Sequence, residues 1–312
     1  MPPVIPIQLP ARRPMDSINM YLIREDPITL IDAGWDSSET EAALARTLQA
    51  EGLTWQDIRR VLVTHTHPDH VGFAYRLETL CPADIYMHVL EWDKLQQGMA
   101  DNLHLFRWAG IPPSYHKASH PHHSDLPSSP AWFKALQDGD ILAFAQGSLT
   151  VVHTPGHCSG QVCLFEEDEG VMFTSDHLIP NFSPALLVEP GPNGLSDRTP
   201  NLQQYQNSLK KAAAFPIQSA YPGHGNRFSD VHAMIDRKLN HSIPEKLKRI
   251  QGFLSERPQT VYDLVTLMIP ELPPALAFFA CGDTLAYLDQ LVAEQRAGSI
   301  LEQERILFYR TD

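Results

Sequence analysis

The 312-residue sequence has no apolar run long enough to cross a bilayer. A transmembrane helix needs about 20 consecutive, mostly apolar residues. The best stretch for this purpose, residues 264–281, contains Glu271 and three prolines. The first 14 residues also lack a basic segment that leads into a continuous apolar run, so we predict no export signal. We therefore expect no membrane partner.

Cysteine is scarce, with only four residues in the chain. Cys81, Cys158, Cys163 and Cys281 are far apart, and none forms a CxxC pair. This pattern favours reduced thiols over a disulfide framework, which is typical of proteins kept in a reducing compartment. We therefore predict a cytoplasmic protein.

Basic residues are also few. The chain has 24 lysines and arginines against 37 acidic residues, which gives a formal charge of −13. Proteins that bind nucleic acid usually present a basic face that releases counterions from the phosphates. A short basic segment at 246–249 is more typical of a solvated helix face. The composition argues against nucleic acid and favours a small-molecule substrate.

The hydrophobic pattern predicts strands and helices mixed along the whole chain, with hairpins at both ends of its larger part. This mixture favours an α+β fold with two layered sheets and outer helices over a purely parallel sheet. Strands are expected at 20–23, 28–31, 60–63, 84–88, 141–144, 148–153, 161–165, 171–174, 218–221, 299–302 and 305–309, and helices at 38–51, 89–99, 202–213, 243–255, 259–268 and 282–297.

The pattern of predicted secondary structure changes near residue 240, where three helical patterns and a short terminal hairpin follow one another. We predict a catalytic domain at 1–238 and a small, mostly helical, winged-helix-like module at 239–312. Within the first domain, residues 101–130 form a long insertion that contains prolines and histidines. We expect this insertion to act as a lid over a cleft of modest size.

The most informative motif is His65-x-His67-x-Asp69-His70, which follows a short apolar strand. In an extended loop, residues two apart point the same way, so His65 and His67 can offer neutral imidazoles to one metal ion. Pro68 suits the first turn of a helix, which would turn Asp69 and His70 toward a second ion. The spacing therefore predicts a strand-to-helix loop that binds metal.

Three further metal-type donors lie on loops that follow predicted strands. His157 ends the sequence Thr154-Pro155-Gly156-His157, Asp176 follows the strand at 171–174, and His224 lies in a Pro-Gly-His-Gly turn. Functional side chains are often carried on loops of a rigid scaffold. These donors are distant in sequence and would come together only in the folded chain.

Together these motifs resemble the metallo-β-lactamase fold superfamily. The resemblance covers roughly residues 15–235 and includes the opening hairpin with Leu30-Ile31-Asp32-Ala33-Gly34. It implies an αββα sandwich with a dinuclear site between two β-layers. The region 240–312 resembles the winged-helix-like extension of one branch, which includes relatives of the human β-lactamase-like protein 2.

The resemblance implies a role for each donor. His65, His67 and His157 would hold one ion, Asp69, His70 and His224 a second, and Asp176 would bridge the two. Asp69 is the catalytic candidate, because it can return a proton to the leaving group. We expect two divalent ions per chain, with zinc first because imidazole-rich sites suit later first-row metals, and with iron or manganese open.

Two bound cations would supply a metal-bridging hydroxide that attacks the substrate. We therefore expect a metal-dependent hydrolase of a small ester, thioester or lactone. Alternatives within the fold are an endoribonuclease or phosphodiesterase and a mononuclear iron, persulfide dioxygenase-like oxidoreductase. A homodimer is also open.

The sequence allows two interpretations for some residues near the predicted metal donors. Asp32 is either an acceptor for a ligand imidazole N–H or a turn residue. His153 and His177 lie beside ligand motifs and are candidates for outer contacts. Cys158 is more typical of packing than of a nucleophile. A set of aromatic side chains offers either core packing or an apolar substrate wall: Trp35, Phe73, Trp92, Phe106, Trp108 and Phe182.

Overall fold

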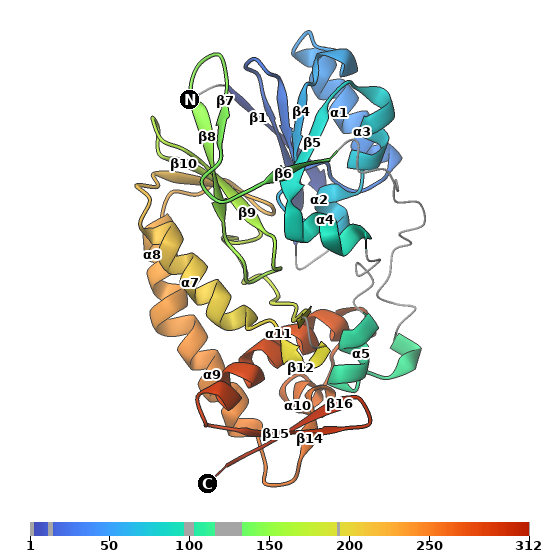
Figure 1. Ribbon diagram of the computed structural model, residues 1–312, viewed down its shortest axis with the longest axis vertical. Coiled ribbons are helices and arrows are strands. Elements are labelled where there is room, and N and C mark those ends of the chain that lie inside the picture. The colour runs from blue at the N-terminus through green and yellow to red at the C-terminus, as the bar shows by residue number, and fades with distance from the viewer. Residues whose placement is uncertain (1–2, 12–14, 97–102, 116–132, 192–193, 312) are drawn as a thin grey trace.

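The computed structural model describes residues 3–11, 15–96, 103–115, 133–191 and 194–311. Figure 1 shows two β-sheets packed against each other at one end of the molecule and a mainly helical part at the other. The α+β class is therefore confirmed.

The first sheet has six strands in the order β1-β2-β3-β4-β5-β6. Strands β1, β2 and β3 are antiparallel, and β3 to β6 are parallel. The opening hairpin is confirmed, with Tyr21 opposite Ile31. The strands are β1 (Val4–Pro10), β2 (Ser17–Ile23), β3 (Thr29–Ile31), β4 (Arg60–Leu62), β5 (Asp84–His88) and β6 (Phe133–Leu136).

The second sheet has five strands in the order β13-β10-β9-β8-β7. Its strands are antiparallel except for β13, which runs parallel to β10 at the edge. The predicted hairpin of β9 and β10 is confirmed, with Phe173 opposite Leu164. The strands are β7 (Ile141–Ala143), β8 (Ser148–His153), β9 (Val162–Glu166), β10 (Val171–Ser175) and β13 (Ser219–Pro222).

Side-chain alternation explains how the sheets pack. In β2, Met20 and Leu22 point to the outer helices, whereas Tyr21 and Ile23 point to the other sheet. This period of two is what a strand buried on both faces requires. Separate apolar clusters lie outside the first sheet, between the sheets and outside the second sheet, which gives the αββα layering.

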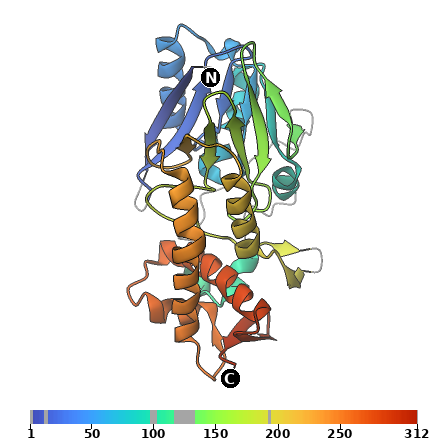
Figure 2. The ribbon, with the colours of Figure 1, turned by 90° about the vertical axis from the view of Figure 1, so that its left-hand side faces the viewer.

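Helices α1 (Ser38–Ala50), α3 (Ala74–Leu80) and α4 (Val89–Gln96) contribute to the cluster outside the first sheet. The hydroxyl of Ser37 caps α1 by accepting a hydrogen bond from the backbone N–H of Thr40. The second sheet is covered by α7 (Asn201–Ala213) and α8 (Val231–Arg237), which Figure 2 shows running along the molecule.

The C-terminal region contains α9 (Ile243–Phe253), α10 (Val261–Met268) and α11 (Pro274–Ala293), and the predicted hairpin is present as β15 (Gly298–Glu302) and β16 (Arg305–Tyr309). A short strand, β14 (Gln259–Thr260), joins this hairpin in a three-stranded sheet. A π-helical turn, Lys238–Ser242, connects α8 directly to α9. The winged-helix likeness and the boundary at 238/239 remain predictions.

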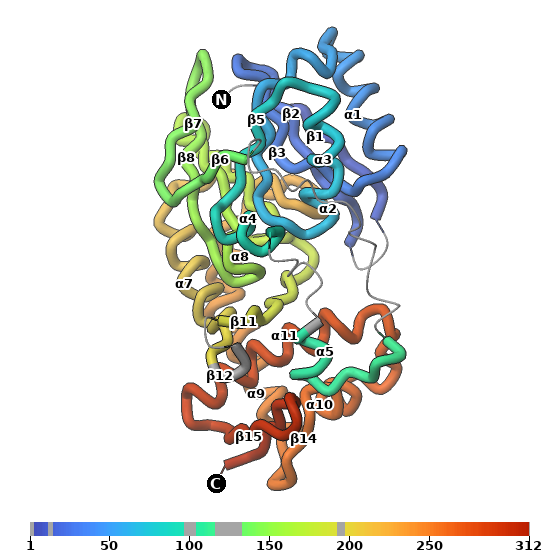
Figure 3. Tube along the Cα trace, turned by 45° about the vertical axis from the view of Figure 1, so that its right-hand side comes forward, coloured from blue at the N-terminus to red at the C-terminus, as the bar shows by residue number. Residues whose placement is uncertain are grey.

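The described part of the 101–130 insertion belongs to the C-terminal core. Helix α5 (Leu103–Ala109) contacts α10, α11 and β16, and the rings of Phe106 and Phe278 lie 5.4 Å apart. Figure 3 shows α5 beside α11. This segment packs into the C-terminal core because its apolar side chains are buried there. Residues 116–130, on which the rest of the lid prediction depends, lie outside the described residues.

Helix α11 is, among the described residues, the one helix long and apolar enough to cross a membrane. Its apolar character has another explanation, because side chains along its length, including Leu285 and Leu288, are fully buried in the protein core. The helix begins at Pro274, eight residues before the predicted start at 282, since proline is well tolerated in the first turn.

Candidate metal centre

The predicted donors lie at the ends of strands from both sheets. His65 and His67 follow β4, and Pro68 starts the short helix α2 (Pro68–Val71), as expected, which carries Asp69 and His70. In the second sheet, His157 follows β8, Asp176 follows β10 and His224 follows β13. Two packed sheets thus bring seven side chains, up to 159 residues apart, into one cluster.

Three imidazoles form one half of the cluster. The Nδ1 of His67 lies 2.9 Å from the Nε2 of His65 and 2.8 Å from the Nε2 of His157. All three residues are among the groups whose donor atoms lie within 4.8 Å of one another. Such a cluster can offer three nitrogen ligands to one ion.

Asp69, His70 and His224 form the other half. The Oδ2 of Asp69 lies 3.5 Å from the Nε2 of His224 and 3.9 Å from the Nε2 of His70. The Asp69 side chain retains some exposure, at 11%, whereas that of His70 has none. Asp69 is therefore the member of this half that water or a substrate can approach.

Asp176 lies between the two halves. Its Oδ1 is 3.4 Å from the Nε2 of His70, and its Oδ2 is 3.3 Å from His224 and 3.5 Å from His157. A carboxylate has two oxygens and can serve two cations, whereas an imidazole nitrogen serves one. Asp176 is placed where a bridging carboxylate would have to be.

Each of several imidazoles has its other nitrogen fixed by an acceptor. The Nδ1 of His70 donates to Asp32 (2.8 Å), that of His157 to the backbone carbonyl of Ala185 (2.6 Å), and that of His224 to the carbonyl of Ser17 (2.7 Å). These contacts set the tautomer and direct Nε2 to the centre. Asp32 therefore accepts a hydrogen bond from a ligand imidazole, which is the first of its two interpretations. Its backbone lies in the left-handed region, with φ of 57°.

The carbonyl contacts of Ala185 and Ser17 could not be found from the sequence. Any residue type supplies a backbone carbonyl, so no motif marks these positions. Only the tertiary fold brings Ser17, in the first strand pair, next to a histidine 207 residues away.

The inward-facing polar atoms provide a test of whether the cluster fits metal ions. Nε2 of His70, Nε2 of His224 and Oδ1 of Asp176 are buried and have no hydrogen-bond partner among the described residues. Buried polar atoms without partners are rare in proteins. Lewis-acidic cations would satisfy all three, so the donor set fits a divalent metal centre.

Gly223 shows how tightly the centre is packed. A Cβ atom at this position would collide with the Oδ1 of Asp176 and would lie 2.8 Å from the Cε1 of His70. The turn before His224 therefore needs glycine for the close approach of its backbone to the two donors.

The electrostatics of the two halves differ. Burial, together with the neighbouring imidazoles, lowers the pKa of His65 and of His67 well below its ordinary value, so both remain neutral. Burial also opposes charge on His70, but Asp32, Asp176 and Asp69 outweigh it and raise its pKa well above the ordinary range. The Asp69 half therefore stabilises positive charge.

Other candidate residues lie around the centre without facing it. The Nε2 of His153 contacts the backbone carbonyl of Ser159 at 2.8 Å, and the ring of His177 packs against Tyr205. Cys158 is buried, which raises the pKa of its thiol well above the ordinary value. A neutral buried thiol is a poor nucleophile, so packing is the better interpretation.

The aromatic candidates divide into residues of the core and one residue near the centre. Phe73, Phe106 and Trp108 are buried in core clusters, and Trp92 stacks on Phe133 at 4.7 Å. Phe182 is different, because it is only partly buried and its ring lies 6.1 Å from that of His224. Within this aromatic set, Phe182 is therefore the candidate for an apolar substrate wall.

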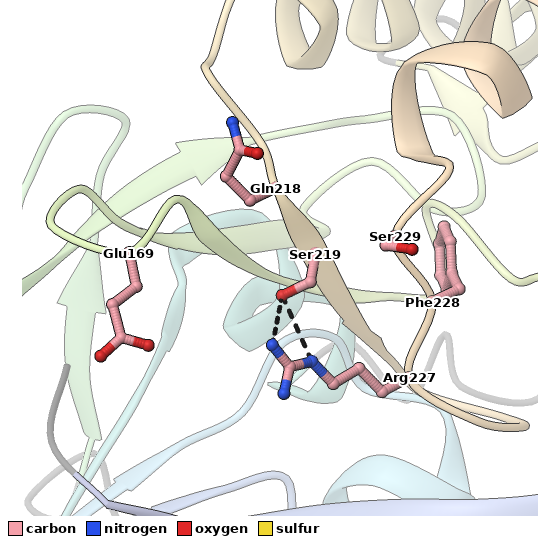
Figure 4. A pocket seen from close by; sticks show the side chains of 6 residues that line it. All are labelled: Glu169, Gln218, Ser219, Arg227, Phe228 and Ser229. Carbon is pink, nitrogen blue, oxygen red and sulfur yellow. Dashed lines mark hydrogen bonds between the residues drawn. The ribbon is translucent and has the colours of Figure 1, made fainter.

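A separate surface pocket of about 340 Å³ lies near the start of β13. Figure 4 shows its polar lining, with the Arg227 guanidinium directed at the hydroxyl of Ser219. None of the seven donors lines this pocket. Its residues are Glu169, Gln218, Ser219, Arg227, Phe228 and Ser229.

Comparisons with known proteins agree with the fold. The metallo-beta-lactamase superfamily model matches residues 13–224. A relative from Bacillus subtilis, named as a probable metallo-hydrolase, is 27% identical over 98% of this chain and 97% of its own length. The solved structure of a metallo-beta-lactamase family protein from Thermus thermophilus has a TM-score of 0.79 at 26% identity, covering 99% of this chain and 98% of the other.

A fungal relative carries a more specific name. It is an atrochrysone carboxyl ACP thioesterase from Aspergillus fumigatus and is 24% identical over 77% of this chain. The match spans 47% of that protein, so the chain resembles about half of it.

Proposed function

The chain belongs to the metallo-beta-lactamase superfamily and is a metal-dependent hydrolase, and on this basis we propose that it cleaves small acyl esters, with thioesters as the preferred class. The observation that carries the proposal is the convergence of seven donors, three of which have buried inward atoms without a hydrogen-bond partner among the described residues. His65, His67 and His157 would hold one ion, Asp69, His70 and His224 the other, and Asp176 both. Zinc is the first choice for both positions, because the donors are mostly imidazoles.

Divalent cations bound at this centre supply Lewis acidity toward a carbonyl oxygen and make water a nucleophile near neutral pH. The chain supplies the rest. Asp32 and the carbonyls of Ala185 and Ser17 hold imidazoles in the required tautomers. Asp69, whose side chain is 11% exposed, would return a proton to the leaving sulfur or oxygen.

The choice of an acyl substrate rests on two further observations. The fungal thioesterase is similar to this chain over 77% of the chain and 47% of the thioesterase's own length. Phe182 places an apolar ring beside His224, which suits an acyl chain better than a phosphodiester. The net charge of −13 counts against a nucleic-acid substrate.

A substrate panel tests this proposal. Zinc-reconstituted protein should hydrolyse acyl thioesters such as S-acyl-N-acetylcysteamines with a kcat/KM at least about tenfold above that for bis(p-nitrophenyl) phosphate or single-stranded RNA, a margin of about 1.4 kcal/mol in transition-state binding. Esters, lactones and a β-lactam complete the panel. Chelation should remove the activity and added zinc restore it. Preferred cleavage of RNA by the zinc-loaded protein, or oxygen consumption with a persulfide by iron-reconstituted protein, would overturn the proposal in favour of the nuclease or dioxygenase alternative.

A further inference from the structure

A fully buried carboxylate lies between two loops of the metal centre. Glu91, on the first turn of α4, is 1% exposed. Its Oε2 accepts hydrogen bonds from the backbone N–H (2.9 Å) and the hydroxyl (2.6 Å) of Thr66, which lies between His65 and His67. Glutamate is almost never buried this completely unless it is paired.

The other oxygen of Glu91 contacts the loop that carries His157. Its Oε1 accepts a hydrogen bond from the backbone N–H of Gly160 at 2.8 Å. A Cβ atom at Gly160 would lie 2.6 Å from the Cγ of Glu91, so the loop approaches this closely only with glycine there. One carboxylate thus ties together the two loops that bear the three imidazoles.

Lys94 neutralises this carboxylate and extends the network to a third loop. Its ammonium contacts Glu91, one turn earlier in α4, and Oε1 of Glu189 at 2.6 Å. The backbone of Glu189 is fixed by Thr199, whose hydroxyl accepts its N–H and whose N–H donates to its carbonyl. Glu189 follows the segment whose Ala185 carbonyl holds His157.

We propose that Glu91, neutralised by Lys94, is a positioning residue that fixes the spacing between His67 and His157 and so sets the affinity of the three-histidine metal position. The inference rests on the proposed two-metal centre. The other half of the centre has separate supports in Asp32 and the carbonyl of Ser17. The effect of Glu91 is therefore confined to one of the two ions.

The test is a zinc titration of metal-stripped protein in competition with a chromophoric chelator, which resolves two binding steps. Glu91→Gln should weaken one step by about 10–100-fold, as loss of an outer hydrogen-bond partner typically does, and leave the other within about twofold. The weakened step must be the one lost in His157→Ala. Thr66→Val, which removes only the hydroxyl donor, should weaken the same step less and provides the test if Glu91→Gln does not fold.

Asp93→Asn is the matched control, because it removes one negative charge from an exposed position on the same helix. Both steps should keep their wild-type affinities. Unchanged affinities in folded Glu91→Gln and Thr66→Val, or equal weakening of both steps, would overturn the inference. A wild-type protein that fails to bind two ions would instead overturn the proposed function.

Discussion

Replacing Asp176 by alanine is expected to abolish turnover. Asp176 lies within 3.5 Å of imidazoles from both halves of the centre, so its loss removes a donor from each predicted metal position. We expect kcat/KM to fall by more than the roughly 100-fold that loss of an outer hydrogen-bond partner can cost. The bound zinc should fall below two ions per chain, as measured by elemental analysis of the gel-filtered protein.

The folded state should survive this change, since nearly all of the core lies elsewhere. Zinc stabilises a protein whose native state binds it by RT ln(1 + [Zn]/Kd), so tighter binding gives a larger stabilisation. The zinc-dependent rise in melting temperature should therefore shrink in Asp176→Ala. Asp168→Ala, at an exposed position in the turn between β9 and β10, removes the same charge and should retain full activity. Wild-type turnover in Asp176→Ala would contradict the assignment of the centre.

The second large effect is expected at Asp32. Its carboxylate accepts hydrogen bonds from the backbone N–H of Thr64 (2.8 Å) and from its hydroxyl (2.9 Å), as well as from His70. Asp32→Ala leaves the backbone N–H of Thr64 and the Nδ1–H of His70 buried without this acceptor, at a cost of about 1–3 kcal/mol for each unsatisfied group, while the Thr64 hydroxyl keeps Ser175 at 2.7 Å. We expect the free energy of unfolding to fall by several kcal/mol and the zinc affinity by about 10–100-fold.

Asp32→Asn separates the two consequences. Asparagine tolerates the left-handed backbone at this position and keeps an oxygen for Thr64. With that oxygen on Thr64, the NH2 group faces the Nδ1 of His70 and can only donate to it, which favours the tautomer that carries its proton on Nε2. Urea unfolding of this variant should be close to wild type, while the zinc step that depends on His70 weakens. Equal affinity in all three proteins would show that Asp32 is only a turn residue.

Asp32→Asn and Glu91→Gln should act mainly on opposite halves of the centre. Asp32 contacts His70 directly and reaches His65 only through Thr64, which asparagine can still bind, whereas Glu91 contacts the loops of His67 and His157. If the outer contacts act independently, a variant can lower the zinc affinity of one metal position while the other position keeps its affinity.

Much of the fold follows from local patterns. The two hairpins, the strand before His65 and the helix start at Pro68 are all visible as short apolar runs with turn residues or a favourable first helical residue. The seven donors were found because the motif fixes four of them and strand ends mark the others. The convergence of these donors depended on the family resemblance, since spacing alone does not bring distant loops together.

Other elements lacked a local signal. Strand β1 contains Pro6 and Pro10, which argue against a strand, and it is tolerated because β1 lies at the edge of its sheet. The first half of α11 is apolar on several faces and so has no helical period, since tertiary packing buries it. Helix α8 and its π-helical link to α9 were also missed.

The Glu91 network also could not be predicted from the sequence alone. Glutamate and lysine three residues apart on a helix are typical of a solvated surface pair. Only the fold shows that Glu91 is buried, that Lys94 beside it is 14% exposed, and that Lys94 meets a second carboxylate 95 residues away. Burial reverses the meaning of the pattern, because a buried charge must be fully paired.

The central claim is that seven side chains hold two cations that the reaction requires. Metal analysis of the reconstituted wild-type chain, with thioester turnover measured on the same samples during stepwise zinc addition, tests this most directly. We predict two zinc ions per chain and activity that reaches its maximum only as the second ion binds. Full activity at one ion per chain, or a single iron with oxygen consumption, would contradict the account.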